Sequence, residues 1–542
     1  MIRALLTTIR SSFPSASKVG AACALIGPKD LPSTDVYREA LEVAPPSDKE
    51  KYSYVSFAPR LLPLTLSLLF APVLVSLSRF ALLSPFLWIF LVWVLVQAAN
   101  IALGAYTSNK KHNVTLRSHQ ATVANSKPLL KKSFDVFLPT AGEPMQVLLN
   151  TYYHVSKLKW KGELNVHVMD DASRLEVMEA AAKYGFNYIV RPNRPKLKKA
   201  GNLRYAFKKT QGDFILVLDA DFVPRADMLL EMVGYFVDPK VGIVQSPQYF
   251  DVKSSHNWLQ KAAGATQELF YRFIQPSRDN SDSAICVGTC AIYRRAALRA
   301  AKGFAPIGHS EDVHTGVRVA KAGYTLRYVP VLLAKGLCPD QMHSFINQQY
   351  RWATGSFSLL SDKSFWTDKH FTPKRLAPFI TGFAYYLTTG ISVYMTPIPV
   401  IVMLFGFHSF ITPLNFLPLT GILFSQFILL PLITKNRMNP SVMRVQTVYG
   451  FAHARAIFDH LRGASAEWVA TGSKIKTRSR AHQIVDGMTA FLTISLTLQL
   501  GGILYAGSLI GIEPLWPAIL FYLFSVYLYM PIIFYRLTLT EK

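Results

Sequence analysis

The sequence predicts an α/β domain set into a multi-pass α-helical membrane protein. Long stretches without Lys, Arg, Asp or Glu predict the membrane part, and they cover residues 61–77, 81–106, 376–434, 487–512 and 514–535. Short apolar runs that alternate with helical patterns between about residues 133 and 352 predict the α/β part. The 542-residue chain has room for both, since one soluble domain takes roughly 250 residues.

Six membrane-spanning helices are expected, two before the α/β domain and four after it. A helix that crosses about 30 Å of hydrocarbon needs about 20 apolar residues. The 59-residue run at 376–434 therefore holds two spans and an interfacial segment, with a turn near His408 and Pro413. A buried core helix is the alternative for any one stretch, but their number in one chain favours spans.

The distribution of basic residues predicts the orientation. The short turns near residues 84, 407–413 and 507–514 hold no Lys or Arg, whereas the N-terminal arm, the central region and residues 435–483 are rich in them. Basic segments stay on the cytoplasmic side, so we expect a multi-pass plasma (inner) membrane protein with a cytoplasmic α/β domain. The net charge of +25 is then mainly a topology signal, strengthened by attraction to an anionic lipid bilayer. Binding to nucleic acid is disfavoured because no basic-aromatic module is present.

These observations predict the order of segments along the chain. They are a cytoplasmic arm (1–60), two transmembrane helices (61–108), the α/β domain (109–370), an interfacial helix with two transmembrane helices (371–434), a cytoplasmic loop (435–485), and two transmembrane helices with a short tail (486–542). Residues 1–30 resemble a targeting segment as well as an amphipathic arm, and we favour the arm. The four cysteines show neither metal-ligand spacing nor a paired framework, which indicates reduced thiols.

Within the α/β domain, five apolar runs read as strands of a mostly parallel sheet. They are SFDVFLPT, ELNVHVMDD, FNYIVRP, GDFILVLDAD and VGIVQSP, and helical stretches at 145–157 and 174–184 separate some of them. Ligands of such sheets bind beyond the carboxyl ends of the strands. Acidic residues gather at those ends here.

Each acidic group has both a functional and a structural interpretation. Asp219 and Asp221 end the strand FILVLDAD, where two carboxylates can bind one divalent cation or can simply form a turn. Lys199 lies in a basic stretch beside a glycine, which suits a phosphate as well as a solvated loop. Glu311 and Asp312 precede a helical pattern, where acids also stabilise a helix N-terminus.

The order of the motifs favours the functional interpretations. The chain contains, in sequence, DVFLPTAGEP, VMDDAS, KKAGN, LDADF, QSPQYF, CVGTCAIYRR, SEDVHTG and QQYRW. This series resembles the membrane-embedded family 2 glycosyltransferases of the cellulose synthase type, from about residue 135 to the final span. The stretch WVATG at 468–472 resembles the gating-loop motif of that family, with Trp for Phe and Ala for Val.

The resemblance implies a GT-A-type, Rossmann-like fold for the central domain and a role for each matching residue. Thr140, Glu143 and Asp170 would hold the uridine of a UDP-sugar, and Lys199 would contact its diphosphate. Asp219 and Asp221 would bind Mg²⁺ or Mn²⁺ at the diphosphate. Asp312 would be the general base, with Glu311 as its nearest rival and His309 and His314 as weaker ones. Thr471 and Lys474 would contact the substrate from the gating loop.

On the acceptor side, the resemblance assigns Gln348, Arg351 and Trp352 to the growing polysaccharide. The alternative is an interfacial anchor before a membrane helix. Polar residues in the next span, including Tyr385, Tyr386, Thr388, Thr389, Ser392 and Tyr394, would line its path, although ordinary helix packing explains any single one equally well.

The implied activity is processive, inverting polymerisation of a UDP-sugar into a β-glucan that crosses the membrane. Val313 stands where chitin-type synthases carry Arg, which favours UDP-glucose over UDP-N-acetylglucosamine. The alternatives are a hyaluronan- or chitin-type synthase, a non-processive glycolipid transferase, and a transporter or scaffold with an inactive domain. Linkage, accessory subunits and homo-oligomerisation stay open.

Overall fold

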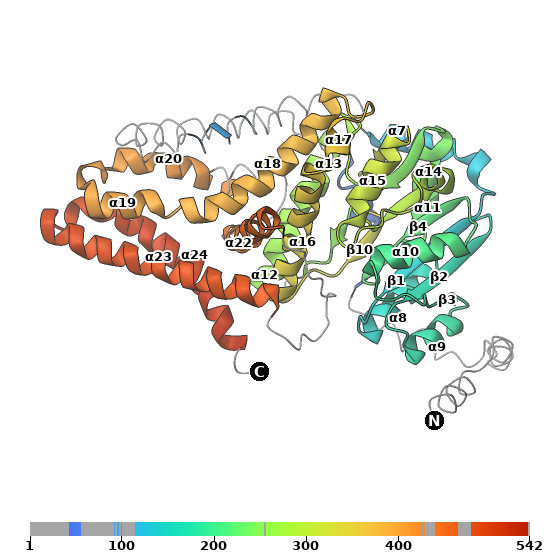
Figure 1. Cartoon of the computed structure of the whole chain (residues 1–542), viewed down its shortest axis with the longest axis horizontal. Helices are drawn as coiled ribbons and strands as arrows, with labels where there is room; N and C mark the ends of the chain where they lie inside the picture. The colour runs from blue at the N-terminus through green and yellow to red at the C-terminus, as the bar shows by residue number, and fades with distance from the viewer. Residues whose placement is uncertain are drawn as a thin grey trace.

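The structure is a computed structural model, and it describes residues 43–55, 114–253, 256–424, 440–463 and 479–539, with a few isolated positions at 92–99 and 427–431. The two spans predicted before the α/β domain, Thr471, Lys474 and residues 1–30 lie outside the described residues. Figure 1 shows the α/β domain at one end and a long helical part at the other.

A seven-stranded sheet forms the centre of the α/β domain, in the order β3-β2-β1-β4-β8-β6-β9. Its strands are β1 (Phe134–Thr140), β2 (Leu164–Asp170), β3 (Asn187–Ile189), β4 (Phe214–Val217), β6 (Val241–Gln245), β8 (Ala291–Arg294) and β9 (Thr325–Tyr328). The five predicted strands are confirmed. All neighbouring pairs are parallel except those of β8, which runs antiparallel to β4 and β6.

A small second sheet follows the carboxyl end of β4 in the chain. It has the order β5-β10-β7, with β5 at Phe222–Pro224, β10 at Ala334–Gly336 and β7 at Tyr249–Phe250. Because β5 follows β4 after only four residues, the second sheet fixes the chain just past the carboxyl end of β4.

Helices cover the main sheet, among them α8 (Met145–Val155), α9 (Leu175–Lys183), α10 (Lys198–Lys209), α14 (Arg295–Ala300) and α15 (Glu311–Lys321). Central strands contribute fully buried side chains such as Phe137 and Leu216. On β1, the buried carboxylate of Asp135 lies 2.7 Å from the guanidinium of Arg295 and 3.0 Å from the imidazole of His167. Paired charges of this kind keep a buried carboxylate stable.

The helical part confirms long apolar helices after the domain. Its described helices are α18 (Pro373–Met395), α19 (Ile398–Gly406), α20 (Pro413–Phe424), α22 (Ser441–Leu461), α23 (Arg480–Ile510) and α24 (Trp516–Leu539). Within the described residues, three segments are long and apolar enough to cross a membrane: Pro373–Gly406, Arg480–Ile510 and Glu513–Tyr535. The predicted turn is present, since a short 3-10 helix at His408–Phe410 precedes α20.

One long helix occupies a region that we expected to be a loop. Residues 435–485 include α22, which packs against α16 (Met342–Leu360), α12 (Trp258–Leu269) and α18. Figure 1 shows α22 nearly end-on beside α18 and α23. Its buried residues Val445, Val448, Ala452 and Ala456 recur at helical spacing between basic residues. The basic residues of this segment, which predict the membrane orientation, therefore also belong to a packed helix.

Residues 43–55 of the predicted N-terminal arm attach firmly to the α/β domain. Lys51 is buried and forms ion pairs with Asp227 at 2.7 Å and with Glu231 at 2.6 Å. Its carbonyl also accepts a hydrogen bond from the backbone N–H of Leu332. This part of the arm therefore belongs to the folded domain.

Candidate active site at the carboxyl ends of the strands

The floor of the site is the turn between β4 and β5, which carries Asp219 and Asp221. The backbone N–H of Asp219 donates to Thr289 Oγ1 at 2.8 Å, and the carbonyl of Ala220 accepts from Thr151 Oγ1 at 2.6 Å. The turn is thus held from both sides, and two carboxylates lie at a fixed place beyond the strand.

Lys199 crosses the site from the first turn of α10. Its ammonium donates to the carboxylate of Asp219 and, at 3.0 Å, to the carbonyl of Gly288, and it lies 3.8 Å from Glu311 Oε1. Burial opposes the charged ammonium, but the two carboxylates outweigh burial and raise the pKa of Lys199. Lys199 is therefore a fixed cation that joins the Asp219 turn to the start of α15.

Asp221 has electrostatic surroundings that favour a cation. Burial, followed by the negative charge of Asp219, raises the pKa of Asp221 to about 7. Two carboxylates that oppose each other's ionisation gain stability when a divalent ion sits between them, and oxygen ligands suit Mg²⁺ or Mn²⁺. Among the residues that the structure describes, no group of three or more His, Cys, Asp or Glu side chains is placed to bind one ion.

Asp312 lies in the first turn of α15, next to Glu311. Burial raises the pKa of Asp312 to about 7, and the neighbouring charge of Glu311 adds to this, while Lys199 acts against it. Both acids do lie at a helix start, as the structural interpretation expected. Ser310, at the N-cap, makes no capping hydrogen bond, however; its hydroxyl donates to the carbonyl of Arg351 at 3.2 Å.

Gly288 is a site residue for which the sequence suggested no role. Its φ of +77° favours glycine, and an added Cβ would lie 2.9 Å from the Cβ and Oδ2 atoms of Asp312. Its carbonyl accepts from Lys199. The only signal in the sequence is its place in the motif CVGTC.

Helix α16 carries the three predicted acceptor residues. Gln348, Arg351 and Trp352 have the i, i+3, i+4 spacing that puts them on one helix face, and all three are half-buried. Burial lowers the pKa of Arg351, although Glu311, Asp219 and Asp312 all act to raise it. The guanidinium therefore lies within the field of the acidic groups.

Contact between α16 and α15 depends on Gly355, which ends the sequence NQQYRWATG. A Cβ at this position would lie 1.9 Å from Ser310 Oγ, so only glycine lets the two helices approach this closely. Ser310 immediately precedes Glu311 and Asp312. The predicted base and the predicted acceptor residues are thus joined through one helix contact.

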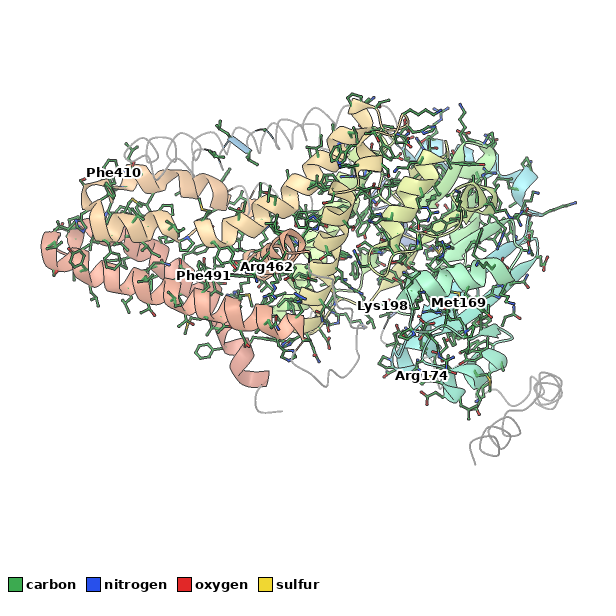
Figure 2. All side chains as sticks on the ribbon, viewed as in Figure 1. Met169, Arg174, Lys198, Phe410, Arg462 and Phe491 are labelled. Atoms are coloured by element: carbon green, nitrogen blue, oxygen red, sulfur yellow. The ribbon has the colours of Figure 1, made fainter. Side chains whose placement is uncertain are left out.

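On the predicted uridine side, the side chains form a local network. Glu143 accepts from the hydroxyl of Thr140 and, at 2.7 Å, from the backbone N–H of Ala141. Arg174, labelled in Figure 2, donates to the carbonyl of Glu143 at 2.8 Å and lies beside the same loop.

Asp170 is fully buried, and its hydrogen bonds stabilise that network. Its carboxylate accepts from the backbone N–H groups of Ala172 at 2.8 Å and Arg174 at 2.7 Å, and from Tyr188 OH at 3.0 Å. Asp171 pairs with Arg191 at 2.5 Å. In the described structure both acids support the loop, and direct contact of Asp170 with a nucleoside stays a prediction.

The rival histidines are less well placed for a proton transfer. His314 contacts Ser358 Oγ at 2.9 Å, and burial lowers its pKa to about 4. Burial also lowers the pKa of His309. The described cysteines Cys286, Cys290 and Cys338 are buried and free, as expected of reduced thiols.

Polar residues of α18 are divided between two environments. Thr389 Oγ1 contacts His453 Nδ1 of α22 at 2.7 Å, and the ring of Tyr386 lies 4.8 Å from the same imidazole. In contrast, Tyr385 and Tyr394 expose 39% and 40% of their surface. Helix packing explains Thr389 and Tyr386, and a role in lining a path stays a prediction.

Comparison with known proteins gives matches to the part of the chain that contains Asp219, Asp221, Glu311 and Asp312. Residues 214–434 match the model of the glycosyl transferase family group 2. The chain is 34% identical over 228 residues to a UDP-forming cellulose synthase catalytic subunit from Xanthomonas axonopodis pv. citri (strain 306), a match covering 41% of this chain and 31% of that protein. It is 36% identical over 226 residues to the corresponding subunit from Pseudomonas fluorescens (strain SBW25), covering 41% and 30%.

Residues 214–434 are therefore similar to glycosyltransferase family 2 domains, and the chain spans only about a third of the length of the cellulose synthase subunits that it matches. Among solved structures, a mannosyltransferase from Pyrobaculum calidifontis in complex with GDP-Man and Mn²⁺ is 18% identical, with a TM-score of 0.46 over 68% of this chain and all of that one. Similarity at that level does not transfer a donor or a metal to this chain.

Proposed function

We propose that this protein is a processive, inverting glycosyltransferase that polymerises UDP-glucose into a β-glucan and passes the product across a membrane. One observation carries the proposal: Lys199 connects the paired carboxylates at the end of β4 to the two acids at the start of α15, beside Arg351. A binding module or scaffold has no need for a cation, two candidate metal ligands and a buried acid of raised pKa at one place.

The donor diphosphate is proposed to bind between Lys199 and the Asp219 turn. Lys199 supplies a positive charge for the phosphate oxygens, and a shift of its ammonium from Asp219 to the phosphate would free that carboxylate for the ion. The paired carboxylates of Asp219 and Asp221 fit a divalent ion, which would neutralise the charge of the departing UDP. Thr140 and Glu143 border the loop where the nucleoside would lie.

Asp312 is the proposed general base. As the acceptor hydroxyl attacks the anomeric carbon, its proton passes to the carboxylate, the bond from carbon to the UDP oxygen breaks, and UDP leaves from the opposite face. A single displacement of this kind inverts the α-linked donor to a β-linked product. Burial suits Asp312 for this role because it brings the pKa towards the working pH.

The rate of transfer should fall in acid. Asp312 accepts a proton only when ionised, and with a pKa of about 7 it becomes protonated as the pH decreases through that value. We expect kcat/KM for polymer formation to fall about tenfold for each pH unit below 7. UDP binding measured at each pH is the control, and a flat rate profile between pH 7 and 5.5 would contradict this assignment.

Trp352 is proposed to stack on a sugar ring of the acceptor, while Gln348 and Arg351 contact hydroxyls or phosphate oxygens. Trp352→Ala should therefore reduce chain elongation by about tenfold, because the indole face removes apolar sugar surface from water at roughly 25 cal/mol per Å², and about 55 Å² corresponds to that factor. UDP affinity, measured by calorimetry, should change little. An equal loss of UDP affinity and elongation would refute an acceptor role.

The helical part is proposed to supply the route of the product. Two of the described segments that are long and apolar enough to span a membrane contain α18 and α23, and both helices pack against α16, which carries Trp352. We propose a cytoplasmic catalytic domain and an acceptor end that stays at α16. Thr471 and Lys474 are proposed to contact the donor from the loop after α22.

Labelled UDP-sugars test the proposal directly. Purified protein in vesicles receives UDP-glucose or UDP-N-acetylglucosamine with Mg²⁺ or Mn²⁺, and linkage-specific glycosidases then digest any product. We expect UDP-glucose to give a long β-glucan. Polymer from UDP-N-acetylglucosamine would support a hyaluronan- or chitin-type synthase, short lipid-linked products a glycolipid transferase, and no turnover with either sugar an inactive domain.

A further inference from the structure

A buried carboxylate outside the site connects three helices. Asp459, near the end of α22, is only 4% exposed. Its Oδ2 accepts from Tyr350 OH of α16 at 2.7 Å and from Arg480 Nη1 of α23 at 2.6 Å, and its Oδ1 accepts from Arg455 Nε at 3.0 Å. Figure 2 labels Arg462, which follows α22 and marks this end of the helix.

The position of Tyr350 makes this junction relevant to the site. Tyr350 is 3% exposed and directly precedes Arg351 and Trp352. Successive helix residues point about 100° apart, so fixing the hydroxyl of Tyr350 on one side of α16 sets the direction of Arg351 and Trp352 on the other. At the next turn, Gly355 contacts Ser310 too closely for α16 to rotate freely.

We propose that Asp459 is a positioning residue for the acceptor side of the site, acting through Tyr350. This inference rests on the proposed function. A charge-assisted hydrogen bond between buried groups is strong and directional. Burial alone would raise the pKa of Asp459, but the hydrogen bonds from Tyr350, Arg480 and Arg455 outweigh burial and lower the pKa, so the carboxylate stays ionised. The rotation of α16 is thereby tied to α22 and to the first residue of α23.

A purely structural role is the alternative, and Tyr350→Phe separates the two. This change removes one hydroxyl and keeps the ring in the core. We expect UDP affinity to stay close to wild type, and the melting temperature to fall by only the few degrees that one lost hydrogen bond costs, because Arg455 and Arg480 still pair with Asp459. The polymer formed per UDP released should fall about tenfold, with free glucose from hydrolysis making up the difference, since a hydrogen bond to a charged group contributes about that factor.

Asp459→Leu, which removes both acceptor oxygens at nearly the same size, should lower the ratio of polymer to hydrolysis in the same way, and the double variant should be no worse than the poorer single one, because both changes break the same bond. Ser361→Ala is the matched control. It removes another hydrogen bond between α16 and α22, from Ser361 Oγ to His460 Nε2 at 2.8 Å, without touching Asp459. It should leave the ratio of polymer to hydrolysis unchanged.

Three results would overturn the inference: an unchanged ratio in Tyr350→Phe, additive losses in the double variant, or a fall in UDP affinity and stability in proportion to the polymer. Wild-type protein that releases UDP without making polymer would instead refute the proposed function. Polymer formation that is normal in both wild type and Tyr350→Phe refutes only the role of Asp459.

Discussion

Asp312→Asn is expected to lower glycosyl transfer by about a hundredfold to ten-thousandfold, the contribution of a general base to enzymatic rates. The amide keeps the size of the side chain and its contact with Gly288. It cannot take the proton of the acceptor hydroxyl. Donor binding should persist, since Lys199, Asp219 and Asp221 are unchanged.

Glu311→Gln is the control for this experiment. Glu311 is the neighbouring acid in the first turn of α15, and its Oε1 lies 3.8 Å from Lys199 Nζ. It should retain most activity. Initial rates of UDP release and of polymer formation are measured in vesicles, with UDP affinity from calorimetry. If Asp312→Asn keeps near-normal polymerisation while Glu311→Gln loses it, the assignment is wrong and Glu311 is the general base.

The parts of the fold that were predicted are those with a local signal. Strands such as β1 and β4 are continuous apolar runs that end in polar residues, so their type and their functional end could both be read. Strand β8 gave a weaker signal because its sequence, AIYR, is four residues long and passes directly into a basic helix. Its antiparallel insertion between β4 and β6 depends on pairing with distant residues.

The candidate site shows the same division. Lys199, Asp219 and Asp312 were predicted from motifs, and the structure brings them together. Gly288 was missed because its role is to lack a side chain next to Asp312, a requirement that arises only when two distant segments meet. Asp459 was missed for a related reason, since its partners come from three different helices.

The burial of Asp170 was also beyond sequence reasoning. An Asp at a strand end reads equally as a ligand-binding group and as a group that stabilises the following turn. Hydrogen bonds from Ala172, Arg174 and Tyr188 show the second role in this structure. Only the positions of those donors separate the two interpretations.

Loss of a divalent ion, or of the carboxylates proposed to hold it, should abolish donor binding. Burial raises the pKa of Asp221 most, and repulsion from the ionised carboxylate of Asp219 raises it further, to about 7. A cation and the donor diphosphate together convert that repulsion into attraction. We expect chelation by EDTA to weaken UDP binding at least about a hundredfold, since such contacts contribute several kcal/mol.

Asp221→Asn should reproduce the effect of chelation in the presence of Mg²⁺ or Mn²⁺, and EDTA should then have little further effect. The matched control is Asp213→Asn, the same change at the opposite end of β4, where the carboxylate is 46% exposed and 3.7 Å from Lys132. UDP affinity is measured by calorimetry with each ion and with EDTA. Binding that stays metal-dependent in Asp221→Asn would move the ion away from this pair, because a site built on two protein carboxylates cannot keep its affinity when one becomes a neutral amide.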